Sequence, residues 1–281
     1  MRRPTPQTIG LVLCGLIFLA GFALNGNFSL YFNLSGLLIV LAGTATATLL
    51  AFRLERLRHL SLVIRGIQTT RPKQEAEIVE VLIDLSIKSR VRGLLSLQED
   101  ENETTILFLR RALSCLVDGY EPQRIREILG TEMTFFKLRR DEHERVLRVI
   151  AEFFPTFGLI GSVVGLIATV GGIHDTTMVL RAIPVALTST LYGLVLANFI
   201  CLPLAASLRE RTNHELLLQK IITEGVIAIE GELNPVILKT KLQSFLTPSE
   251  RRAKPVSLAR IRERFRIAER VGAPSAEAME K

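Results

Sequence analysis

The sequence has few of the residues that define specialised protein classes. Its 281 residues include 19 Gly, 11 Pro and three Cys, which excludes a collagen-like chain, a disordered chain and a disulfide-stapled scaffold. It holds instead 48% hydrophobic residues beside 35 Lys and Arg and 28 Asp and Glu, with a mean hydropathy of +0.32. Apolar and charged residues in these proportions must be segregated along the chain.

Charge is missing altogether from four runs of the sequence, at residues 8–24, 33–52, 154–173 and 182–207. Each run approaches the ~20 apolar residues that cross a bilayer core. Runs this continuously apolar predict helices rather than the alternating strands of a barrel. The sequence therefore predicts an all-α, polytopic membrane protein with four transmembrane helices and a helical cytoplasmic domain.

Basic residues are nearly absent from the two short loops that would face outward. All but one of the 35 Lys and Arg residues precede the first run, lie between residues 53 and 152, or follow Ser207; the exception is Arg181. We therefore expect both termini and the long middle segment in the cytoplasm. A cleaved signal peptide would leave three spans and place the basic segment outside, against this asymmetry. Because topology explains the basic charge, we expect no nucleic-acid partner.

The segments outside the four runs predict helices. Gly93 and Gly130 are expected at helix ends, and Pro122 at a helix start. The predicted domains are 1–52 with the N-terminal tail and first two spans, 53–152 as a cytoplasmic helical domain, 153–207 with the third and fourth spans, 208–250 as a cytoplasmic C-terminal helical region, and 251–281 as a basic tail. That tail is either an amphipathic helix bound to membrane lipids or a solvated segment.

No Asp, Glu, Lys, Arg or His lies inside any of the four runs. A self-sufficient proton relay places an ionisable group in the bundle, so a partner must bring the carboxylate if this chain conducts protons. Small and hydroxyl-bearing residues recur instead at helical spacing: Gly158, Gly161, Ser162, Gly165, Thr169, Ala186, Thr190, Gly193 and Ala197. Such stripes serve close helix packing, and they also suit a narrow polar path lined by Ser162 and Thr190.

Two prolines lie near the cytoplasmic ends of the third and fourth runs, Pro155 and Pro203. Each removes a backbone donor, so each is either a simple kink or a hinge between the membrane and the cytoplasmic helices. The sequence pairs no nucleophile with a base and has no metal-ligand cluster or phosphate loop. We therefore expect neither an enzyme nor a bound cofactor.

Four motifs together resemble a known family. They are GLLIVLAGTATATLL (36–50), PTFGLIGSVVGLI (155–167), ALTSTLYGLVLANFICLPLAASL (186–208) and EGVIAIEGELNPVILKTKLQSFL (224–246). In this order they resemble the flagellar motor stator A-subunit family, MotA/PomA, over about residues 8–250, within the wider MotA/TolQ/ExbB proton channel group. The third and fourth runs alone are also typical of the TolQ/ExbB proteins.

The resemblance implies a multi-pass protein of the bacterial inner membrane that couples the flow of protons, or of sodium ions, to torque. Five copies would form a ring around two copies of a MotB-like B-subunit, whose single span supplies the ion-carrying aspartate. Ser162, Thr190 and Ser189 would face that aspartate, and Pro155 and Pro203 would be the coupling prolines. The alternative is an ExbB/TolQ-like energiser of another envelope process.

The resemblance also implies charged cytoplasmic residues that touch the flagellar rotor switch protein. In the matching stretch SRVRGLLSLQED, Arg90 lies three residues before Gly93, as in the family pattern. The family's glutamate falls on Gln98, with Glu99 beside it. This departure leaves three possibilities open: Glu99 substitutes, the rotor differs, or the output is not a flagellar rotor.

Overall fold

In the computed structural model, every regular element among the described residues is a helix, which confirms the all-α class. The described residues are 13–18, 20–21, 24, 31–69, 75–104, 106–171 and 176–247. The first predicted span, 8–24, therefore lies partly outside them, and the basic tail 251–281 lies wholly outside.

Three of the described helical stretches are long and apolar enough to cross a membrane: Leu34–Ala51, Pro122–Gly171 and Ala182–Glu230. They overlap the second, third and fourth predicted spans. A membrane protein with helical spans is thus supported, while the count of four remains a prediction.

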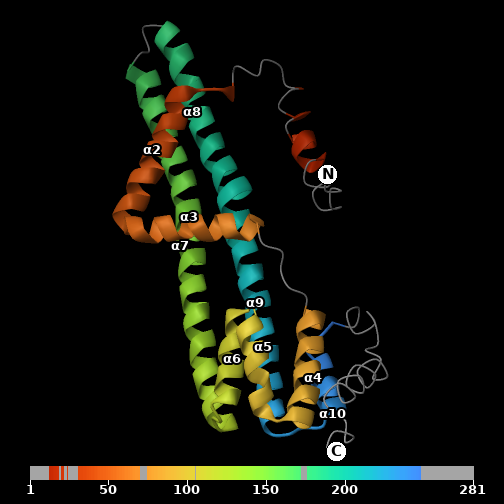
Figure 1. The fold of residues 1–281 in the computed structure, drawn as a ribbon. Helices are drawn as coiled ribbons and strands as arrows, with labels where there is room; N and C mark the ends of the chain where they lie inside the picture. Colours follow the sequence, from red (N-terminus) through yellow and green to blue (C-terminus); the bar gives the residue numbers. More distant parts are fainter. Residues whose placement is uncertain are drawn as a thin grey trace, which may run out of the picture. The chain divides into compact units, whose positions relative to one another are not determined.

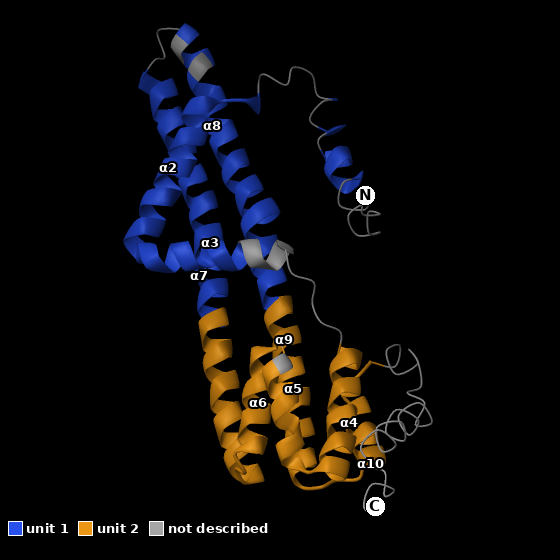
Figure 2. Cartoon of the chain, in the orientation of Figure 1, with its two compact units in different colours: residues 1–68, 141–209 blue, residues 69–140, 210–281 orange. Residues whose placement is uncertain are grey.

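The chain divides into two compact units (Figure 2). Unit 1 comprises residues 1–68 and 141–209, and unit 2 comprises residues 69–140 and 210–281. Helices α7 (Pro122–Gly171) and α9 (Leu202–Glu230) supply residues to both units. The polar stretch before the third apolar run belongs to the same helix, α7, as that run.

Unit 1 contains α2 (Leu34–Ala51), most of α3 (Leu54–Thr69), part of α7, and α8 (Thr176–Val195) (Figure 1). Helix α2 begins where the Asn33 side chain accepts a hydrogen bond from the Gly36 N–H, at 3.0 Å. The Tyr192 hydroxyl of α8 accepts from the Asn33 N–H at 2.7 Å and donates to the Tyr31 carbonyl at 2.5 Å. One phenol therefore fastens the start of α2 to α8.

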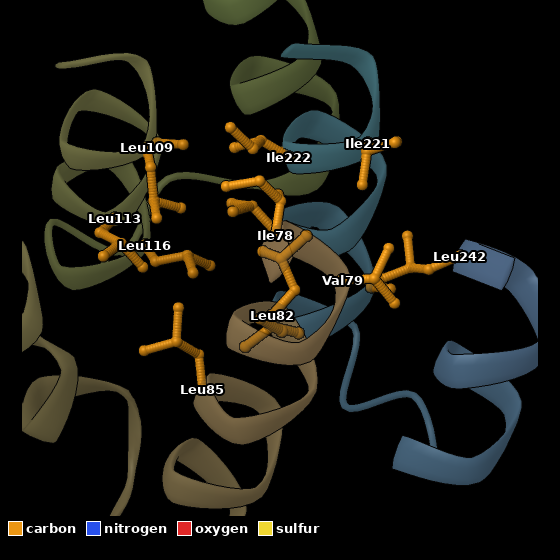
Figure 3. Close-up of a cluster of buried hydrophobic side chains, with 14 of the residues drawn as sticks. Ile78, Val79, Leu82, Leu85, Leu109, Leu113, Leu116, Ile221, Ile222 and Leu242 are labelled. Carbon is orange, nitrogen blue, oxygen red and sulfur yellow. The ribbon is translucent and has the colours of Figure 1, made fainter. Parts of the chain in front are cut away.

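Unit 2 is a helical bundle around one apolar core (Figure 3). It contains α4 (Glu75–Arg92), the 3-10 turn η2 (Leu94–Leu97), α5 (Gln98–Glu103), α6 (Leu107–Val117) and α10 (Pro235–Gln243), with parts of α7 and α9. The core side chains come from helical positions three or four apart, including Ile78, Leu82, Leu85, Leu109, Leu113, Leu116, Ile221, Ile222 and Leu242. This spacing places one face of each helix against the core.

Two of the three predicted helix boundaries are confirmed. Pro122 is the first residue of α7, and α4 ends at Arg92 just before Gly93. The prediction of a helix end at Gly130 is wrong, because α7 continues through it. Ile125 and Leu129, before Gly130, are fully buried, and Met133, after it, packs against the same core. This packing on both sides of the glycine outweighs the cost of ~1 kcal/mol for a glycine inside a helix.

Candidate functional site

The stripe of small residues lies where α7 and α8 touch. A Cβ added to Gly165 would lie 2.6 Å from the Ala186 backbone nitrogen and 2.8 Å from its Cα. At Gly193 it would lie 2.5 Å from the carbonyl oxygen of Phe154. These neighbours are backbone atoms, which cannot swing aside as a side chain can. The stripe therefore allows α7 and α8 of one chain to make direct backbone contact.

Two predicted polar residues meet across this contact. The Ser162 and Thr190 hydroxyl oxygens are 2.5 Å apart, and both side chains are half-buried. The Ser162 hydroxyl also lies within hydrogen-bond reach of the Ala186 and Gly158 carbonyls. A hydroxyl has one proton and two lone pairs, so Ser162 and Thr190 can exchange the roles of donor and acceptor.

Ser189, the third residue of the predicted ion path, has different surroundings. Its exposed fraction is 0%, and its hydroxyl donates to the Val185 carbonyl at 2.6 Å. A Cβ added to Gly36 of α2 or to Gly161 of α7 would lie 2.7 or 2.6 Å from its Oγ. Ser189 therefore lies at the junction of three helices of its own chain, and Ser162 and Thr190 are less enclosed.

Pro155 lies inside α7, opposite Gly193 of α8. It has no N–H to donate to the Ala151 carbonyl, so the helix lacks one internal hydrogen bond there. Its Cα lies 3.1 Å from the position that a Gly193 Cβ would take. A helix loosened by proline thus packs against a glycine on its neighbour.

Pro203 follows a change of helical register. After α8 the chain runs as a π-helix over Leu196–Cys201, and the Leu202 N–H bonds to the Ala197 carbonyl five residues back. Pro203 has no N–H, and the wider π turn accommodates this missing donor at the start of α9. The proline predicted to be a kink or a hinge therefore coincides with a feature that often marks functional sites in helices.

Arg90 is held by the turn between α9 and α10. Its guanidinium donates to the Glu232 carbonyl. Glu232 follows the end of α9 and adopts the left-handed backbone conformation, with a φ of 50°. Glycine is the usual residue at such a position. Arg90 shares no hydrogen bond or ion pair with Gln98 or Glu99, although all three side chains are described and exposed.

Glu99 lies instead beside Lys88, a residue that sequence reasoning missed. The Lys88 ammonium is 2.7 Å from an Asp100 carboxylate oxygen and 3.4 Å from one of Glu99. Partial burial opposes the charged form of Lys88, but the hydrogen bond and charge of Asp100 outweigh it, so the pKa of Lys88 lies above its usual value. The Glu99 side chain stays 80% exposed. The sequence offered one sign of this cation: Lys88 is four residues from Arg92, a spacing that places both on the same face of α4.

No group of three or more His, Cys, Asp or Glu among the described residues could hold a metal ion. The three cysteines make no disulfide, and Cys115 and Cys201 are buried.

Comparisons with known proteins agree with this arrangement. The model of the MotA/TolQ/ExbB proton channel family matches residues 100–220. An uncharacterised protein of Bacillus subtilis, YtxD, is 28% identical over 252 residues, covering 90% of this chain and 92% of its own. Motility protein A of Treponema phagedenis is 31% identical over 244 residues, covering 87% of this chain and 94% of its own. The chain belongs to the motility protein A (MotA) family.

A solved MotA-containing structure extends the match to three dimensions. The flagellar MotAB stator complex from Bacillus subtilis superimposes with a TM-score of 0.80 at 26% identity, covering 86% of this chain and 96% of that one. The structural match therefore extends beyond the residues that the family model covers, since it includes 86% of this chain.

Proposed function

We propose that this chain is the ring-forming subunit of an ion-driven rotary stator and works with a single-span, MotB-like partner. One observation carries the proposal: the third and fourth apolar runs form a tight helix pair that has hydroxyls but no Asp, Glu, Lys, Arg or His. The structures that it resembles are complexes of MotA with MotB. A partner helix with a carboxylate would complete the ion path.

The translocated ion is proposed to be a proton, with sodium as the alternative. The exchangeable hydroxyls of Ser162 and Thr190 suit a hydrated proton path, and their oxygens could also coordinate Na⁺. Ser189 would support the path by packing α2, α7 and α8 together. Each charge that crosses releases ~2.3 kcal/mol per 100 mV of membrane potential, and Pro155 and Pro203 would pass the resulting movement to the cytoplasmic helices.

The assembly is proposed to be five of these chains around two partner chains in the bacterial inner membrane, with both termini in the cytoplasm. The end of α4 that carries Arg90 and the start of α5 with Gln98 and Glu99 would face the flagellar rotor switch protein. Gln98 also favours a second candidate, an ExbB/TolQ-like energiser of another envelope process. The match over nearly the whole MotA chain in the MotAB complex supports the stator.

The deciding experiment is to purify the tagged chain from its native membranes in mild detergent and to identify co-purifying proteins by mass spectrometry. We expect a stoichiometric single-span protein with a membrane aspartate and a peptidoglycan-binding domain, and native mass spectrometry then gives the subunit ratio. A short-tailed transport partner would favour the energiser. Recovery of the chain without any single-span partner would overturn the proposal.

A second experiment tests the hydroxyl pair. Thr190→Ala removes one hydroxyl, and Thr190→Ser, which keeps it, is the matched control. We expect Thr190→Ala to assemble with the partner but to lose most ion uptake and motility, and Thr190→Ser to retain both. Full motility with Thr190→Ala would remove this hydroxyl from the mechanism.

A further inference from the structure

Helix α3 begins directly after α2, which is long and apolar enough to cross a membrane. Only Phe52, in an extended conformation, and Arg53 separate the two helices. Within unit 1, α3 turns from the direction of α2 and runs across α7 toward α9 (Figure 1). With α2 in the membrane, a helix that starts this close to its end lies at the membrane surface. The proposed topology makes this the cytoplasmic surface.

One face of α3 is packed against its own unit. Leu60 has an exposed fraction of 4% and belongs to one apolar cluster with Val146 of α7 and Leu208 of α9. Leu57 and Ile64 pack against the same cluster. These contacts orient α3, so that its opposite face points away from α7 and α9.

The opposite face of α3 combines exposed leucines with an arginine. Leu54, Arg58 and Leu62 follow one another at four-residue spacing, which places them along one side of the helix. The exposed fractions of Leu54 and Leu62 are 70% and 57%, and that of Leu50, in the last turn of α2, is 85%. The apolar surface of α2 therefore continues onto α3. Leucines in such a place enter the boundary between headgroups and acyl chains, and arginines beside them extend to the phosphates.

Three arginines at the start of α3 have no partner in the chain. Arg53, Arg56 and Arg58 are exposed, and their guanidinium groups make no hydrogen bond or ion pair with any described residue. By contrast, Arg148 on α7 lies 2.8 Å from the Glu144 carboxylate. The positive charge of α3 is therefore left for a partner outside the chain.

The one carboxylate of α3 does not neutralise this charge. Glu55 is exposed in the first turn, where the helix dipole favours a negative charge. Residues 53–69 hold four Arg and this single Glu. The segment is thus positively charged overall, and the partner that complements it is an anion.

We infer that the start of α3 is a binding site for anionic phospholipids of the cytoplasmic leaflet. Arg53, Arg56 and Arg58 bind the headgroup phosphates, since a guanidinium group can bind phosphate through two parallel hydrogen bonds. Leu54 and Leu62 enter the region between headgroups and acyl chains. A negatively charged leaflet attracts a basic segment beside a membrane span, whereas a zwitterionic leaflet offers it no net charge. The inference rests on the proposed topology and not on the motor function.

The test uses the full chain as purified from its membranes, reconstituted into phosphatidylcholine vesicles. The chain has no Trp, so Leu62→Trp places a fluorophore on the exposed face of α3. Emission from any co-purified protein is measured with the wild-type chain and subtracted. The vesicles contain equal fractions of either brominated phosphatidylcholine or brominated phosphatidylglycerol, whose bromine atoms quench tryptophan on contact. We expect brominated phosphatidylglycerol to quench about twofold more strongly.

Neutral variants in the Leu62→Trp background test the arginines. Arg53→Gln, Arg56→Gln and Arg58→Gln are combined to remove the three charges. Arg111→Gln, which removes an exposed arginine from α6 of unit 2, is the control. We expect both brominated lipids to quench the triple variant equally, and the preference for phosphatidylglycerol to persist in the control.

Absence of quenching by either lipid would place α3 outside the bilayer and overturn the site. Equal quenching with all three arginines present, or a preference that survives their removal, would overturn the binding of headgroups by these arginines. If the triple variant fails to accumulate, Arg58→Gln is measured alone, and a smaller loss of the preference is expected. The readout is lipid contact and not rotation, so these outcomes are separate from those that test the stator function.

Discussion

Gly165 has no side chain, and the backbone of Ala186 fills the space where one would lie. Gly130 is in the same helix, but nothing lies within 4 Å of its missing Cβ. The two glycines therefore have opposite effects on stability. At Gly165 the absent side chain permits the α7–α8 contact, whereas at Gly130 it only adds freedom to the unfolded chain.

We predict opposite outcomes for Gly165→Ala and Gly130→Ala. The first forces α7 and α8 apart and should lower the free energy of unfolding by about 1–3 kcal/mol, and the second should raise it by up to about 1 kcal/mol. Thermal unfolding of the detergent-purified proteins, followed by circular dichroism at 222 nm, measures both. Equal midpoints for the two variants would contradict the contact.

Glu224 joins three helices of unit 2, outside the apolar segments. Its carboxylate is 2.6 Å from the Lys241 ammonium on α10 and 3.4 Å from the Arg126 guanidinium on α7. Partial burial opposes ionisation, but the hydrogen bond and charge of Lys241, and the charge of Arg126, outweigh it and hold the pKa of Glu224 below its ordinary value of 4.5. Its contribution to stability is present above pH 4.5 and is lost as the pH falls through the lower folded-state pKa.

We therefore predict that Glu224→Gln lowers the free energy of unfolding at pH 7 by about 1 kcal/mol, since Lys241 is partly exposed to solvent. The difference between wild type and variant should shrink as the pH is lowered below 4. Thermal midpoints at pH 7, 5 and 3.5 measure it. A difference that stays constant with pH would mean that the carboxylate charge is not the cause.

Among the helices, the segment from α8 to α9 combines two departures from the α-helix, the π turn and Pro203. The π turn has the Leu202 N–H bonded to the Ala197 carbonyl. With an N–H restored at position 203, the chain could form α-helical bonds there and tighten the turn.

We predict that Pro203→Ala converts Leu196–Cys201 to an α-helix and lowers rotation speed several-fold, while leaving assembly intact. Pro235→Ala is the control, because Pro235 stands in the first turn of α10, where no helical bond is lost. The hydrogen-bond register from cryo-electron microscopy and the rotation of tethered cells measure the two effects. If Pro203→Ala keeps the π turn, then packing of the surrounding side chains, and not the proline, causes that turn.

The sequence was sufficient to predict features that depend on composition along the chain. Helical spacing and the absence of charge predicted the apolar helices, and Pro122 marked the start of α7. It could not predict contacts between distant residues, such as that of Tyr192 with Asn33, because no local pattern encodes them. It also misplaced a helix end at Gly130, where buried neighbours decide. Arg90 came from the family pattern, but only the structure revealed its bond to Glu232.

At the scale of the whole molecule, orientation in the membrane follows from where the basic residues are. We predict that green fluorescent protein fused after Lys281 fluoresces and that alkaline phosphatase fused there is inactive, since both report a cytoplasmic C-terminus. The same two reporters inserted at residue 174, between α7 and α8, should give the opposite pattern. Active phosphatase at the C-terminus would refute the proposed topology.

The Tyr192 bridge to the start of α2 gives the molecule an optical property. The chain contains no Trp and three Tyr. Two of these, Tyr31 and Tyr192, meet in the bridge through a carbonyl and a phenol, and Tyr120 belongs to unit 2. Near-ultraviolet emission from the chain therefore comes in large part from one junction in unit 1. Tyr120→Phe would turn the protein into a fluorescent reporter of that junction, without any added dye.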